Sequence, residues 1–223
     1  MSNPQQKSTS TISMLRTLAG VATLSGFLIV FVYEFTFPII KKNRAEVLKK
    51  AIFQVMPAAK SYKKFAEKDG KLVEISEDQE IAEAYYGCYD DTNNLIGFAL
   101  EASGMGFVDI IKVLYGYSTN KEAVIGNMVL ETKETPGLGD KIEKDADFVR
   151  NFEELDVKLT EDGSKLQNPI EVVKKGKKTE KWQIDAITGA TISSKAIGKI
   201  LLESTQKRLP VIHKSLDVLG ASK

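Results

Sequence analysis

The chain of 223 residues contains one cysteine, Cys88, and one histidine, His213. A lone cysteine cannot form an internal disulfide, and these two residues cannot build a cysteine- or histidine-rich metal or iron–sulfur centre, so we expect no structural metal. An excess of one charge sign is also absent, because 31 Lys and Arg residues stand against 30 Asp and Glu residues. Nucleic-acid-binding proteins usually carry a basic excess, so this balance argues against a nucleic-acid partner.

Charge is missing altogether from residues 17–33, and apolar residues predominate again over 35–40. A spanning helix needs about 20 mostly apolar residues to cross about 30 Å of hydrocarbon. We therefore predict a membrane anchor over residues 14–40, behind a polar tail over 1–13. Two alternatives are weaker. A cleaved signal peptide has a shorter apolar region followed by a small-residue cleavage site, and a buried core helix rarely runs this long without charge.

The rest of the chain divides into a helical connector over 41–70 and a larger domain over 71–223. Helical spacing of apolar residues predicts a helix over 43–55, ended near Pro57. A second short helix is expected over 61–67. In the domain, Val- and Ile-rich or alternating stretches predict strands and hairpins. These strands cover residues 72–76, 81–89, 95–101, 107–117, 123–132, 170–173 and 182–187. Turns over 90–94, 118–121 and 174–178 are expected to join three pairs of them into hairpins, and the last of these turns is lysine-rich.

Two further helices complete the prediction, one over residues 146–155 and one that starts near Thr191 and ends before Pro210. The last helix places Ile192, Ala196 and Ile200 on one face. The expected fold class is α+β: a single N-terminal transmembrane helix followed by a domain of β-hairpins and helices.

A first segment with potential chemistry reads Glu134-Thr-Pro-Gly-Leu-Gly139. Gly137 and Gly139 can adopt positive φ and let main-chain N–H groups approach a ligand closely. Gly/Pro turns are also common as plain connections between a strand and a helix, and the residues alone favour that reading.

A second segment reads Asp185-Ala-Ile-Thr-Gly-Ala-Thr-Ile-Ser-Ser194 and joins a predicted strand to a helix. The free N–H groups and the dipole of a helix start favour a phosphate. The residues alone favour ordinary helix capping, which explains one hydroxyl there. The four hydroxyls of Thr188, Thr191, Ser193 and Ser194 are more than capping needs.

These two segments, in this order behind an apolar helix, resemble the G subunit of the Rnf electron-transport complex, a member of the covalent FMN-binding domain family. The resemblance implies that FMN is attached through a phosphoester to Thr191, the final residue of Thr-Gly-Ala-Thr. It implies that Thr188, Gly189, Ala190, Ser193 and Ser194 surround the attachment point. It also implies that the loop residues Glu134, Thr135, Gly137, Leu138 and Gly139 lie against the flavin. Many relatives have His where Thr132 stands, which leaves any imidazole role in doubt.

The resemblance further implies partners and a location. A separate flavin transferase would make the bond and recognise Asp185, and the other Rnf subunits would exchange electrons with the flavin. The protein would have no substrate site of its own. Positive charges flanking the anchor would keep the domain in the cytoplasm, but the resemblance places it outside the inner membrane. The alternatives are the C subunit of the sodium-translocating NADH:quinone reductase and a membrane-anchored binding or assembly module without a redox role.

Overall fold

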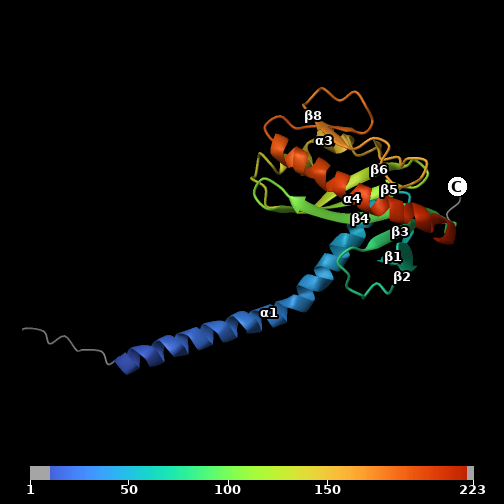
Figure 1. Ribbon diagram of the computed structural model, residues 1–223. Helices are drawn as coiled ribbons and strands as arrows, with labels where there is room; N and C mark the ends of the chain where they lie inside the picture. Colours follow the sequence, from blue (N-terminus) through green and yellow to red (C-terminus); the bar gives the residue numbers. More distant parts are fainter. Residues whose placement is uncertain (1–10, 220–223) are drawn as a thin grey trace, which may run out of the picture. The chain divides into compact units, whose positions relative to one another are not determined.

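The computed structural model describes residues 11–219, which form two compact units that meet at Val47 and Leu48 (Figure 1). The first unit is the greater part of helix α1 (Thr11–Val55). Its large apolar side chains are exposed, and an 18-residue window reaches a mean hydropathy of 1.9. By length and composition this helix can cross a membrane, as predicted. Residues 1–10 of the expected tail lie outside the described residues, and the helix already begins at Thr11.

Polar side chains within α1 are adapted to apolar surroundings. The hydroxyls of Thr23 and Thr36 each donate to the carbonyl four residues earlier, at 2.8 Å in both cases. These internal hydrogen bonds satisfy hydroxyl donors that would have no partner among lipid chains. The helix also continues through Pro38.

The second unit is built on a seven-stranded antiparallel sheet in the order β2-β1-β3-β4-β5-β6-β7. Its strands are β1 (Ser61–Lys68), β2 (Lys71–Glu74), β3 (Tyr85–Tyr89), β4 (Leu95–Met105), β5 (Ile110–Ser118), β6 (Ala123–Glu131) and β7 (Leu155–Asp156). Two short helices, α2 (Lys141–Lys144) and α3 (Ala146–Arg150), follow β6. A separate pair, β8 (Glu171–Val173) and β9 (Gln183–Asp185), precedes the long helix α4 (Thr191–Leu219).

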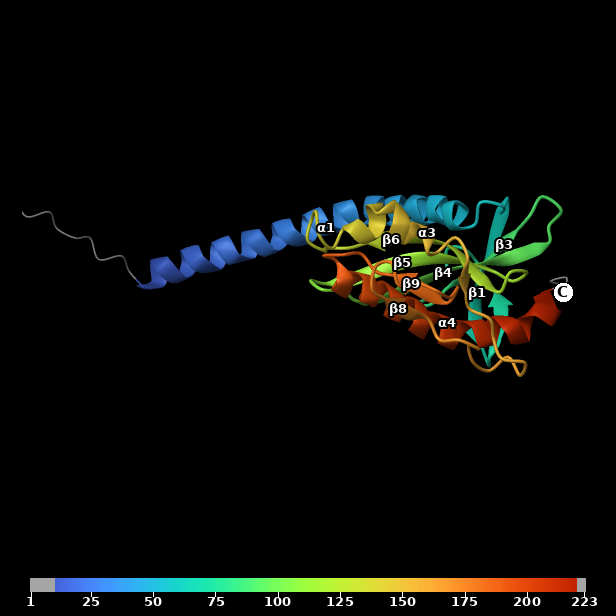
Figure 2. The same ribbon diagram turned by 90° about the horizontal axis from the view of Figure 1, so that it is seen from above.

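Both faces of the sheet centre are covered, as Figure 2 shows, by α4 on one side and the last turns of α1 on the other. Because side chains alternate along a strand, Tyr85 and Tyr89 of β3 join the core under α4. Tyr86 and Cys88 join the core with Ile52 of α1. This double cover explains why every residue of β3 is buried.

Two glycines make room for the end of α1. Gly116 of β5 faces Gly126 of β6 in the strand register. A Cβ at Gly116 would lie 2.3 Å from the carbonyl oxygen of Val55, and one at Gly126 would lie 2.8 Å from it. The absence of both side chains therefore lets the α1 backbone rest directly on the sheet.

The structure confirms the α+β class, the hairpins around residues 90–94 and 118–121, and the helix that starts at Thr191. The short helix predicted over 61–67 is wrong: this segment is β1, which is held in the sheet by pairing with β2 on one side and β3 on the other. The helix predicted over 146–155 ends at Arg150, and the strand predicted over 81–89 begins only at Tyr85.

Two further expectations fail near the C-terminus. The hairpin expected around residues 174–178 is absent, since β8 and β9 pair in parallel, with Val173 opposite Asp185. The last helix does not end before Pro210 but runs on to Leu219. Burial of Leu209 and Ile212 in the same core as the first half of α4 offsets the hydrogen bond that proline cannot make.

Candidate functional site

The start of α4 presents a group of unused hydrogen-bond donors. Among the described residues, the backbone N–H groups of Thr191, Ile192 and Ser193 have no partner, and neither do the hydroxyls of Thr188 and Thr191. Both threonines are exposed. These donors, together with the positive end of the helix dipole, suit a phosphate group.

The connection that leads to this helix start is rigidly made. Gly189 has φ +85°, a conformation that favours glycine, and no atom lies within 4 Å of where its Cβ would be. The buried hydroxyl of Ser194 donates to the carbonyl of Ala190 at 2.8 Å and accepts from the N–H of Ile187 at 3.1 Å. Ser194 and the buried Ala190 therefore shape the turn, while Thr188, Gly189 and Thr191 face outward.

A buried hydrogen bond joins the two motifs predicted from the sequence. The hydroxyl of Ser193 donates to a carboxylate oxygen of Glu134, which is 59 residues away along the chain. Only 3% of Ser193 and 5% of Glu134 is exposed. A charged acceptor makes this bond stronger than one between neutral groups. The Glu134 loop is thereby fixed beside the helix start that carries Thr191.

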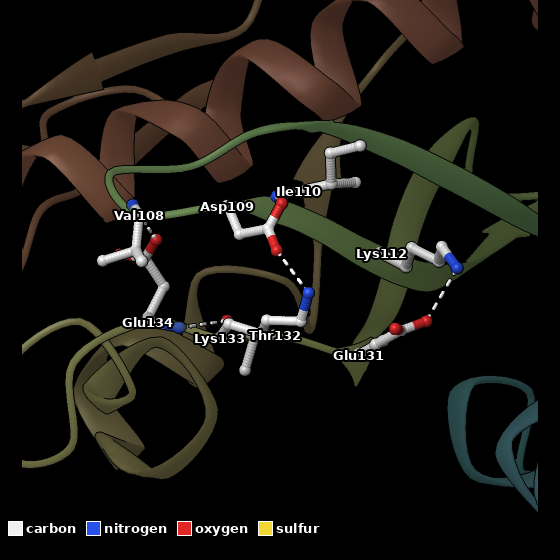
Figure 3. Close-up of polar contacts among 8 residues, drawn as sticks. All are labelled: Val108, Asp109, Ile110, Lys112, Glu131, Thr132, Lys133 and Glu134. Atoms are coloured by element: carbon white, nitrogen blue, oxygen red, sulfur yellow. Dashed lines mark hydrogen bonds and ion pairs between the residues drawn. The ribbon is translucent and has the colours of Figure 1, made fainter. Parts of the chain in front are cut away.

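The same carboxylate holds the turn between β4 and β5. Its other oxygen accepts the backbone N–H groups of Phe107 at 2.8 Å and of Val108 at 2.9 Å. Figure 3 shows this contact with Val108 and the hydrogen bond from the N–H of Glu134 to the hydroxyl of Thr132. Thr132 thus helps to place Glu134.

Charge pairs reinforce the same junction. Lys133 and Asp109 lie 2.5 Å apart, and Lys112 and Glu131 lie 2.7 Å apart (Figure 3). The hydrogen bond from Lys133 lowers the pKa of the Asp109 carboxyl below its usual value. Both pairs are exposed and stabilise the fold little, but they keep the end of β6 close to the β4–β5 turn.

The glycines of the 134–139 loop allow close packing within the protein more than they allow a ligand to approach the backbone. A Cβ at Gly139 would lie 2.5 Å from a Glu134 carboxylate oxygen and 3.0 Å from the Ser193 hydroxyl. The N–H groups of Leu138 and Gly139 point to the carbonyl of Thr135, at 3.1 and 3.0 Å. Gly137, at φ +78°, is exposed and unobstructed. The loop therefore offers a ligand the side chains of Thr135 and Leu138 more than its amides.

Three apolar side chains at this junction do not lie where they were predicted. Phe107 and Val108 precede β5 instead of belonging to a strand over 107–117, and Ile192, predicted on the apolar face of the last helix, is exposed. Phe107, Val108 and Ile192 are 63%, 48% and 57% exposed, and the predicted loop residue Leu138 is 52% exposed. Phe107 and Val108 are bonded to the Glu134 carboxylate, and Ile192 precedes Ser193 in the chain. An apolar pair between Gly106 and Asp109 was the available signal, since such turns are usually polar.

Asp185 lies at the end of β9, and its carboxylate is turned toward the lysine-rich segment. It accepts the backbone N–H of Gly176 at 2.8 Å and that of Lys177 at 3.3 Å. The buried side chain of Asn151 clamps the Asp185 backbone, accepting from its N–H at 3.0 Å and donating to its carbonyl at 3.2 Å. Asp185 therefore fixes the 174–178 turn to the strand that leads to Thr191.

Comparisons with known proteins identify the class. The family model for the FMN-binding domain matches residues 106–205, a range that contains the β4–β5 turn and both motifs. The C subunit of the Na(+)-translocating NADH-quinone reductase from Parabacteroides distasonis has the same fold. Its TM-score is 0.57 at 18% identity, over 76% of this chain and 94% of that one. The second unit is an FMN-binding domain.

Two curated relatives narrow the assignment. The G subunit of an ion-translocating oxidoreductase complex from Methanosarcina acetivorans is 26% identical over 92% of each chain. The G subunit of the Na(+)-translocating ferredoxin:NAD(+) oxidoreductase complex from Acetobacterium woodii is 31% identical over 69% of this chain and 66% of that protein. The chain belongs to the family of G subunits of Rnf electron-transport complexes.

Proposed function

We propose that this protein is an electron-carrying flavoprotein subunit of a membrane-bound, ion-translocating ferredoxin:NAD oxidoreductase complex. Its FMN is bound through a phosphoester to Thr191. The observation that carries the proposal is the buried bond between Ser193 and Glu134, which brings both family motifs to one exposed helix start. The curated relatives named above are subunits of such complexes. The quinone reductase structure supports the fold alone. The role of a C subunit in a sodium-translocating NADH:quinone reductase is therefore the weaker alternative.

The residues at the helix start fit a phosphate-bearing flavin. The free amides of Thr191, Ile192 and Ser193 and the hydroxyl of Thr188 can donate to phosphate oxygens. The exposed side chains of Leu138 and Phe107 offer apolar surface to an aromatic ring system. Bound FMN supplies one- and two-electron transfer, and the chain supplies its position.

Attachment forms one bond between Oγ1 of Thr191 and the flavin phosphorus. The hydroxyl proton leaves, and a leaving group must depart from the same phosphorus. A flavin dinucleotide is the class of donor that provides one, because its pyrophosphate bond breaks as the new ester forms. A flavin transferase would catalyse this step and recognise the segment that begins at Asp185. A covalent ester suits a relay, because the carrier cannot then dissociate in either redox state.

The remaining assignments belong to the same proposal. Residues 14–40 anchor the protein in the lipid of the inner membrane, and residues 71–223 carry the flavin outside the cytoplasm. Residues 41–70 connect these two parts. The compact unit itself starts at Leu48. The protein relays electrons between the other subunits of the complex and has no substrate site of its own.

The test is expression of the full chain together with a flavin transferase, followed by in-gel fluorescence after denaturation and intact-mass analysis. Thr191→Ala should be folded, colourless and lighter by the FMN adduct. Thr188→Ala is the matched control, since this threonine is also exposed and its hydroxyl has no partner among the described residues, and it should keep the fluorescent band. Fluorescence in both variants would show that the flavin is not esterified to Thr191. Loss only in Thr188→Ala would identify the other threonine.

A further inference from the structure

The turn over residues 174–178, hereafter the lysine turn, concentrates positive charge on an otherwise balanced protein. Four of its five residues are lysines, and all five are exposed. Residues 174–185 contain five lysines against Glu180 and Asp185, an excess of three, whereas the whole chain carries a net charge of +1. The lysine turn is thus a local departure from the composition of the chain.

Seven other lysines each form an ion pair with an acidic neighbour. Ion pairs with Asp or Glu involve Lys63, Lys112, Lys133, Lys144, Lys181, Lys199 and Lys207. By contrast, Lys174, Lys175 and Lys177 form no ion pair with any described residue. Lys178 donates to Asn151 at 3.2 Å, and partial desolvation lowers its pKa. The lysine turn therefore carries a net positive charge, which the Asp185 carboxylate bound to its backbone offsets only in part.

The position of this field is fixed with respect to Thr191. The Asp185 carboxylate holds the turn at Gly176 and Lys177, and Asp185 is six residues before Thr191, which limits their separation to about 20 Å. On the other side, β8 packs against α4 so closely that a Cβ at Gly198 would lie 2.2 Å from the Val172 side chain. The lysine turn is therefore part of the rigid unit that presents Thr191.

We propose that the lysine turn is the docking surface for an acidic face of the redox protein that exchanges electrons with the flavin on Thr191. This inference rests on the proposed function. A protein interface of about 800 Å² per partner is roughly 30 Å across, so one interface is wide enough to include both the turn and Thr191. A local net charge steers such encounters and sets their orientation. In each encounter the reduced partner is oxidised as the flavin is reduced, or the reverse.

The test uses the assembled complex with the full chain. The triple charge reversal Lys174→Glu, Lys175→Glu, Lys177→Glu is compared with Lys60→Glu, Lys68→Glu, Lys71→Glu, which alters three exposed lysines that also lack ion pairs with described residues, on and beside the β1–β2 hairpin. Stopped-flow absorbance follows reduction of the flavin on this chain. In-gel fluorescence gives the fraction of chains that carry flavin.

We expect the lysine-turn variant to load flavin normally and to exchange electrons at least about tenfold more slowly at low salt. The difference in electron-exchange rate between the lysine-turn variant and the wild-type chain should narrow at 1 M salt, where the Debye length falls to about 3 Å. Rates equal to those of the hairpin control would overturn the inference. So would a lower loaded fraction with an unchanged rate per flavin, because the turn would then serve the loading enzyme. Absence of flavin from the wild-type chain would instead refute the proposed function.

Discussion

Removal of the Glu134 carboxylate tests whether the two motifs are held together by one buried side chain. Glu134→Ala deprives the Ser193 hydroxyl and the N–H groups of Phe107 and Val108 of their acceptor. Glu134→Gln keeps an oxygen for the two N–H groups and places an amide that can donate to the Ser193 hydroxyl. The charge is then lost, and the Ser193 hydroxyl must accept a hydrogen bond at this position instead of donating one.

The magnitudes follow from burial. A hydrogen bond to a charged group contributes about 1.5–3 kcal/mol, and the Ser193 bond is inaccessible to water. The two turn N–H groups lie near the surface, where water replaces much of the lost bonding, so they add about 0.5 kcal/mol each. Glu134→Ala should therefore lower the free energy of unfolding by about 3 kcal/mol. Glu134→Gln should lower it by about 1 kcal/mol.

Circular dichroism during heating of the detergent-solubilised full chain measures the difference. For a unit of this size, Glu134→Ala should lower Tm by roughly 6–12 °C and Glu134→Gln by roughly 2–4 °C. Glu161→Ala, at an exposed residue without a described side-chain hydrogen bond, is the control and should change stability by less than about 0.5 kcal/mol. If Glu134→Ala lowers Tm no more than this control does, the Ser193–Glu134 hydrogen bond does not hold the site together.

Four further predictions concern the rest of the chain. Burial raises the pKa of the Cys88 thiol to about 12, so iodoacetamide at a mildly alkaline pH should leave the folded protein unmodified and label one site in denaturant; labelling of the folded state would contradict the packing. Arg208 donates to two backbone carbonyls and lies 3.9 Å from the Tyr85 ring centre, so Arg208→Lys should cost about 2–3 kcal/mol in urea unfolding. Gly116→Ala should cost about 1–3 kcal/mol, because its Cβ meets the Val55 carbonyl; an unchanged midpoint would mean that α1 is not seated there. Alkaline phosphatase fused to the C-terminus should be active in intact cells if the domain is outside, and activity of a cytoplasm-only reporter would reverse this topology.

Much of the fold and site followed from local patterns. Alternation and turn residues predicted the hairpin around 90–94, and hydroxyl clustering before an apolar stripe predicted the helix start at Thr191. These features depend on residues close together in the chain, which is what sequence patterns report. The position of the Glu134 loop next to Ser193 followed from the family resemblance and not from any local signal.

The failures arise where distant contacts decide the outcome. The lysine turn resembles a hairpin tip, but the Asp185 carboxylate and Asn151 direct the chain into a parallel pair. Pro210 signals a helix end, but burial of Ile212 carries the helix past it. The exposed apolar residues Phe107 and Val108 of the β4–β5 turn could be assigned to the site only once their hydrogen bonds to the Glu134 carboxylate were seen.

The packing of the end of α1 on Gly116 and Gly126 has a consequence for biogenesis. Ala51, Ile52 and Val55 complete the core that covers Tyr86 and Leu114, yet they belong to the helix that also contains the apolar span. These residues are synthesised just after the span and long before the strands they cover. The sheet must therefore assemble onto a segment already present at its N-terminal border. A fragment that begins at residue 71 would leave that face of the sheet open to water.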